Sequence, residues 1–149
     1  MLRSDAHGAA NLLGRALALL PPGDSLRPSA ALECISILED LGEREHRLQL
    51  IEELEQADDP AVRMRGRIVR SGFRIEAEPA EAVEEAEAVA AEALTVFAAA
   101  DDDLGAAYAY DLAAYASWLR SRAVPTLRAL EALLSHAEQA GHGCLPAAR

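Results

Sequence analysis

The chain contains no lysine: all 14 of its basic residues are arginine, against 25 aspartate and glutamate residues. The net charge of −11 argues against a general nucleic-acid-binding or anionic-membrane-binding surface, since both need positive charge. Aromatic residues are only 4% of the 149, and cysteine occurs twice, at Cys34 and Cys144. Two thiols so far apart indicate reduced cysteines in a cytoplasmic protein and not a disulfide framework.

Several motifs are also lacking. No apolar run approaches ~18 residues, so no membrane-spanning helix is predicted. Residues 1–20 include charged and polar side chains, and we identify no signal peptide there. There is no nucleophile elbow, no phosphate-binding glycine loop and no HExxH motif, so we expect neither enzymatic activity nor a cofactor. The acidic runs at 84–87 and 101–103 do not form an EF-hand loop, and we interpret them as helix caps and solvated helix faces.

What the sequence has in abundance is small apolar residues. Residues of the hydrophobic classes make up 51% of the chain, and 33 residues are alanine, the best helix former. This composition predicts an all-α fold. The length suits one domain, which we place at 1–141, followed by a flexible tail at 142–149. Arginine-only, alanine-rich usage is typical of GC-rich bacterial genomes.

Periodicity and punctuation predict seven helices. Asp58-Asp59-Pro60 reads as a cap followed by a first-turn proline, and Gly42 and Gly141 end helices. The predicted ranges are about 5–20, 28–41, 43–57, 60–74, 79–100, 103–121 and 124–140. Because the connections are short, neighbouring helices should pack antiparallel, as one half-repeat followed by the pairs 28–57, 60–100 and 103–140.

The first helix carries the clearest repeat pattern. Small residues stand at Ala9 and Ala16, large ones at Leu13 and Leu17, and Pro21 ends the segment. This spacing resembles the second helix of a tetratricopeptide repeat (TPR), in which small residues allow a neighbouring helix to approach closely. The resemblance implies that the chain opens with half a repeat, whose apolar face lacks a companion helix.

A second resemblance covers the last helix pair. The residues that carry it are Ala93, Leu94, Phe97, Asp101, Asp102, Leu104, Gly105 and Ala107. They resemble a run found in the TPR-like arrays of large bacterial signalling ATPases, class III nucleotide cyclases and LuxR-type regulators. The resemblance, over roughly 5–141, implies a TPR-like α-α superhelix of half a repeat plus three helix pairs. It also implies a module that binds a protein, a peptide or a neighbouring domain within a larger signalling or transcription-regulating protein. Arg47, Leu54, Thr126 and Leu133 depart from the small residues of the repeat pattern.

Four arginines, Arg63, Arg67, Arg70 and Arg74, form one stripe on their predicted helix. Guanidinium groups bind carboxylates and phosphates, so the stripe is a candidate partner-binding site. The alternative is an intramolecular role, in which the arginines pair with glutamates of the next helix at Glu81, Glu85 and Glu92.

The scarce aromatics gather on the helix at 103–121. Tyr108 and Tyr115 share a face, Trp118 lies beside them and Tyr110 lies opposite. Tyrosine and tryptophan are favoured binding anchors, and in a superhelix this helix would line the concave side. The alternative for Tyr108, Tyr115 and Trp118 is core packing. We expect Tyr110 to be the most exposed and the best single candidate for a partner contact.

Three further hypotheses follow from the residues. His136, His142 and Cys144 could form a metal cluster, but they straddle a helix end and a predicted tail, and we expect no metal site. The chain could instead be a self-contained helical bundle that homodimerises through its first helix. It could also be a regulatory module that binds a small ligand at the 103–121 helix.

Overall fold

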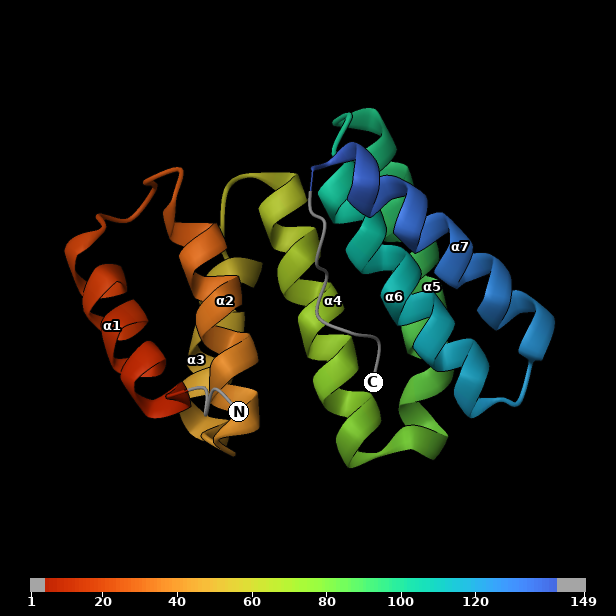
Figure 1. Cartoon of the computed structure of the whole chain (residues 1–149), viewed down its shortest axis with the longest axis horizontal. Helices are drawn as coiled ribbons and strands as arrows, with labels where there is room; N and C mark the ends of the chain where they lie inside the picture. Colours follow the sequence, from red (N-terminus) through yellow and green to blue (C-terminus); the bar gives the residue numbers. More distant parts are fainter. Residues whose placement is uncertain (1–4, 142–149) are drawn as a thin grey trace. The chain divides into compact units, whose positions relative to one another are not determined.

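The computed structural model describes residues 5–141, which form seven α-helices and no strand (Figure 1). The helices are α1 Ala6–Leu19, α2 Arg27–Asp40, α3 Arg44–Glu55, α4 Pro60–Ala77, α5 Pro79–Ala99, α6 Asp103–Leu119 and α7 Ala123–Gln139. The all-α class and the seven helices are therefore confirmed. The largest difference from the predicted ends is at α4, which continues to Ala77. Within the described range, no helix combines the length and the apolar character that a bilayer crossing requires.

Aspartate side chains cap the starts of three helices. Asp5 caps α1, Asp59 caps α4 and Asp102 caps α6. Their carboxylates accept hydrogen bonds from the backbone N–H groups of Gly8, Ala61 and Gly105 at 2.9, 2.8 and 2.9 Å. These bonds satisfy donors that the first turn of a helix leaves without a partner. The caps predicted at Asp58-Asp59 and within the acidic run at 101–103 are thus confirmed.

The chain divides into two compact units, Met1–Asp58 with α1–α3 and Asp59–Arg149 with α4–α7. The division falls at the Asp58-Asp59-Pro60 turn, which the sequence marked only as a helix boundary. The predicted tail at 142–149 lies outside the described residues.

In the first unit, α2 packs against both α1 and α3. Its buried side chains include Cys34 and Ile35, and those of α3 include Ile51 and Leu54. Burial raises the pKa of the Cys34 thiol, because a thiolate is poorly solvated there. On the outer side of α1, Leu12 and Leu19 are exposed. They lie seven residues apart, on one face of that helix.

One arginine ties the three helices of this unit together. The Arg27 guanidinium donates hydrogen bonds to the carbonyl oxygens of Leu17 and Leu20 at the end of α1, the latter at 2.7 Å. It also forms a two-point ion pair with the Glu53 carboxylate of α3. The last carbonyls of a helix have no partner within the helix, so Arg27 satisfies them while its charge is neutralised by Glu53.

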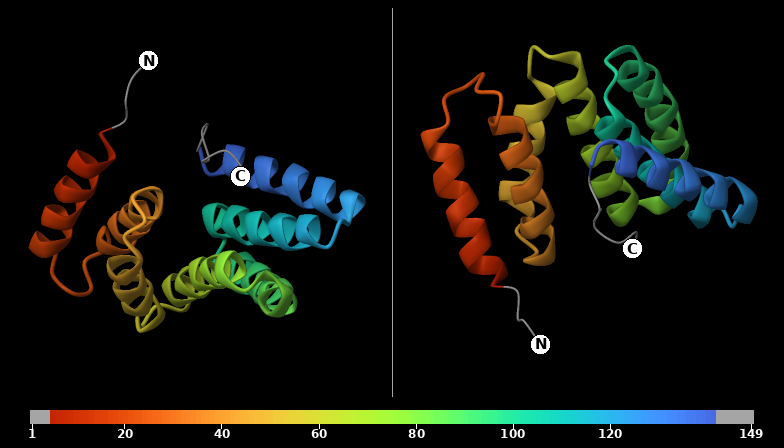
Figure 2. Two further views of the ribbon diagram at one scale, coloured as in Figure 1. Left: turned by 90° about the horizontal axis from the view of Figure 1, so that it is seen from below. Right: turned by 45° about the horizontal axis from the view of Figure 1, so that its top comes forward.

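In the second unit, α6 lies between α7 on one side and α4 and α5 on the other (Figure 2). The core combines small residues of α5 and α6, such as Ala86, Ala93 and Ala109, with the fully buried ring of Phe97. Gly105 packs against that ring so closely that an added Cβ would lie 2.3 Å from Phe97 Cδ1. The alanine-rich composition therefore acts here by letting helix backbones approach one another closely.

Candidate partner-binding surface

The outward side of α6 carries four side chains that we call the α6 face: Tyr108, Asp111, Tyr115 and Trp118. Their spacings of three, four and three residues place them along one stripe of the helix. The intervening Leu112 is buried in the core. The stripe therefore lies at the boundary between the core of the second unit and solvent.

The aromatic residues of this face differ in burial. Tyr108 and Tyr115 are half-buried and pack against the core of the second unit. Trp118 is 60% exposed, and its ring stacks on Tyr115 with the centroids 6.1 Å apart and the planes 15° from parallel. The alternative of core packing therefore holds in part for Tyr108 and Tyr115, and it does not hold for Trp118.

The prediction that Tyr110 is the most exposed aromatic is wrong. Tyr110 is half-buried, and its ring stacks on His136 of α7 at 5.5 Å and 18°. His136 Nδ1 lies 2.7 Å from Asp103 Oδ1 at the start of α6. Tyr110 therefore joins α6 to α7, because it points to the side of α6 that α7 covers. The exposed aromatic is Trp118.

Asp111 lies at the centre of the α6 face, between the two tyrosines. Its side chain is exposed, and within residues 5–141 it makes neither a hydrogen bond nor an ion pair. The protein around it nevertheless desolvates the carboxylate and raises its pKa above the ordinary value for aspartate. The α6 face thus presents a carboxylate that has no partner among residues 5–141 and is flanked by aromatic rings.

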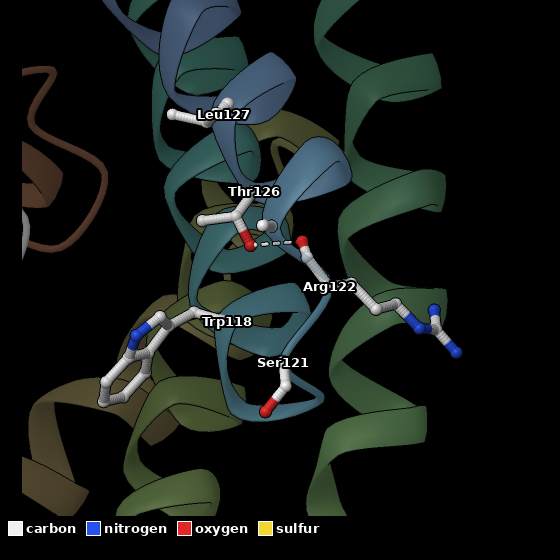
Figure 3. A pocket seen from close by; sticks show the side chains of 6 residues that line it. Trp118, Ser121, Arg122, Thr126 and Leu127 are labelled. Atoms are coloured by element: carbon white, nitrogen blue, oxygen red, sulfur yellow. Dashed lines mark hydrogen bonds between the residues drawn. The ribbon is translucent and has the colours of Figure 1, made fainter.

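A shallow hollow of about 370 Å³ adjoins Trp118 at the turn between α6 and α7. It is lined by Trp118, Ser121, Arg122, Ala123, Thr126 and Leu127. Figure 3 shows Trp118 and Leu127 pointing to one side of this hairpin, while Arg122 points to the opposite side. All but one of the lining residues are exposed, so the hollow is open and does not enclose a small ligand as a typical pocket would.

The arginine stripe of α4 is at least partly intramolecular. Arg67 forms a two-point ion pair with Glu92 of α5 at 2.6 and 2.8 Å, and Arg74 pairs with Glu85. The Arg67 guanidinium lowers the pKa of the Glu92 carboxyl by hydrogen bonding to its charged form. The alternative stated above is confirmed for these two pairs.

The remaining members of the stripe, Arg63 and Arg70, lie on α4 and also have interaction partners. The stripe is therefore a weaker candidate than the α6 face for contact with another molecule. Of the proposed metal cluster, His136 is engaged by Tyr110 and Asp103, whereas His142 and Cys144 lie outside the described residues.

Two features of this surface were missed from the sequence. The aromatic pattern did not mark Asp111, although its spacing from Tyr108 and Tyr115 places it on their face. The exposed apolar residues Leu127 and Leu134 of α7 were also missed, since both fit the pattern of a core stripe. Comparison of the chain with models of protein families, with curated proteins and with solved structures finds no match.

Proposed function

We propose that the chain is a protein-binding module built from TPR-like helical hairpins, and that the α6 face captures a segment of a protein partner. The observation that carries this proposal is the exposure of Trp118 beside Tyr115 in a chain with very few aromatics. Aromatic side chains bury a large area at little entropic cost, which suits them to anchor a partner.

The helix packing of the second unit supports the repeat part of the proposal. Consecutive helices α4 to α7 pack as sequential neighbours, and α4 also contacts α6. Stacked helix pairs bring their first helices together in this way. By the resemblance noted above, the module would relay partner binding to a signalling or transcription-regulating domain of a larger protein. We place it in the cytoplasm, where cysteines stay reduced, because the buried Cys34 forms no disulfide within residues 5–141.

The open hollow beside Trp118 favours an extended partner segment over a small molecule. Five exposed residues line it, so a bound small molecule would keep much of its surface in water. A peptide lying along α6 would cover the hollow and the stacked rings together. Trp118 is the only tryptophan, so its fluorescence reports on this contact directly.

A random peptide library selected against the whole chain tests the proposal. We expect enriched peptides that change Trp118 fluorescence on binding and that lose affinity about tenfold or more for Tyr115→Ala, as for an anchor residue. Glu84→Ala, an exposed change on α5, serves as the control and should bind equally well. Failure to enrich peptides, or binding that Tyr115→Ala leaves unchanged, would contradict the proposal.

Self-association through α1 is a second candidate. Leu12 and Leu19, 66% and 85% exposed, form an apolar stripe on that helix. Sedimentation of the chain at rising concentration tests it directly. A dimer that dissociates in Leu12→Asp and Leu19→Asp would support this candidate, and a monomer at all concentrations would exclude it.

A further inference from the structure

We infer that the partner segment bound by the α6 face carries an arginine or lysine that contacts Asp111, and a large apolar side chain that enters the hollow beside Trp118. The inference rests on the proposed function, because it specifies the chemistry of the partner that the α6 face binds. It follows from what surrounds Asp111, from the charge of the chain and from the spacing along α6.

No arginine among residues 5–141 neutralises Asp111. In the second unit, five arginines form ion pairs with other carboxylates: Arg65 with Asp102, Arg67 with Glu92, Arg74 with Glu85, and Arg120 and Arg122 with Glu87. Asp111 makes no such pair within residues 5–141. A cation supplied by a partner would therefore gain a charge-assisted hydrogen bond without displacing an existing one.

The rings beside Asp111 favour the same ligand chemistry. Tyr108 precedes the carboxylate by three residues and Tyr115 follows it by four, so one ring lies a helical turn to each side. The faces of aromatic rings attract guanidinium and ammonium groups. An arginine side chain also has an apolar stem that can pack along such rings while its head reaches the carboxylate.

The negative net charge of the chain also favours a basic partner segment. At −11, the chain attracts cationic segments and repels acidic ones over a distance set by the ionic strength. An acidic or phosphorylated segment would meet both this repulsion and the Asp111 carboxylate. The α6 face therefore fits a basic segment better than a phosphopeptide.

The distance between Asp111 and Trp118 on α6 determines how far apart the cationic and apolar side chains of the partner must lie. Asp111 and Trp118 are seven residues apart, which is roughly 10 Å along a helix. An extended segment covers that distance in about three residues, and a helix in about seven. The cation and the apolar side chain of the partner should therefore stand three apart in an extended segment, or seven apart in a helix.

The experiment uses peptides enriched from the random library. We expect them to carry arginine or lysine at this spacing from an apolar residue. Replacement of that arginine with neutral citrulline, and Asp111→Asn in the protein, should each weaken binding about tenfold. The two changes together should weaken it little further, because both remove the same contact.

Glu84→Gln is the matched control, since it removes one exposed negative charge from α5 without touching the α6 face. Equal losses for Glu84→Gln and Asp111→Asn would overturn the inference by showing that only net charge matters. Peptides that need Tyr115 but bind Asp111→Asn normally would also overturn it, while leaving the proposed function intact. The citrulline peptide tests the contact without altering the protein, so a folding defect cannot imitate the result.

Discussion

Arg65 of α4 binds Asp102 at the start of α6, with Nη2 lying 2.8 and 2.6 Å from the two carboxylate oxygens. The same carboxylate caps α6 by accepting a hydrogen bond from the Gly105 N–H at 2.9 Å. Both charged side chains are largely buried, and the guanidinium lies over the Phe97 ring, 5.9 Å from its centroid. One carboxylate thus starts α6 and holds α4 against it.

Asp102→Asn should lower the free energy of unfolding by roughly 1–3 kcal/mol. Asparagine still caps the helix, but it leaves the Arg65 charge in a largely buried place without its counter-ion. Urea unfolding followed by circular dichroism measures the loss. Asp101→Asn is the control, since Asp101 is exposed and asparagine tolerates its positive φ of 53°. Equal effects at the two positions would show that the ion pair contributes nothing.

Gly105→Ala should destabilise the second unit by ~1–3 kcal/mol or more. The added Cβ would lie 2.3–2.6 Å from atoms of the fully buried Phe97 ring, so the ring or the helix backbone would have to shift. The melting midpoint should fall accordingly.

Gly72→Ala makes the same chemical change in the middle of α4, where no atom lies within 4 Å of the added Cβ. Because alanine is the better helix former, this variant should gain about 0.5–1 kcal/mol. Opposite signs for the two variants are the expected result. A stable Gly105→Ala protein would show that α6 and the Phe97 ring are not packed as closely as described.

Tyr110→Ala should lower stability by roughly 1–3 kcal/mol, because it removes a half-buried ring and its stacking on His136. Trp118→Ala should change stability by only about 0.5 kcal/mol, since that side chain is mostly exposed. Thermal unfolding of the two variants measures the contrast. If Tyr110→Ala left the stability unchanged, the result would support the sequence-based prediction that Tyr110 is a surface contact.

Asp111→Asn should make the fold more stable at pH 7. The raised pKa of Asp111 means that the folded protein disfavours the ionised carboxylate relative to the unfolded chain. That cost is fully present above the folded-state pKa, shrinks as the pH falls through it and vanishes below the unfolded value. The stability gain of the variant should shrink in the same way in unfolding curves taken from pH 7 down to about pH 3, below the ordinary pKa of aspartate. A variant less stable than the parent at pH 7 would contradict this account.

Local signals determined the helices, since their ends depend on nearby residues. Asp59 before Pro60 and Asp102 before the sixth helix act within one turn, so the sequence alone located them correctly. The pairing of Arg67 with Glu92 was also foreseeable, because it needs only two antiparallel neighbours in the expected register.

The exposure of the aromatic side chains could not be predicted from local signals, because it depends on which sides of α6 the neighbouring helices cover. Helical periodicity places Tyr110 opposite Tyr108 and Tyr115, but it does not say which side α7 will cover. In the folded chain α7 packs over Tyr110 and leaves Trp118 in solvent. The sequence by itself thus determined the class, the helices and their caps, which are short-range properties. Only the tertiary structure decided which ring is exposed and that Asp111 has no partner in the described part of the chain, because both depend on contacts between helices that are distant in the chain.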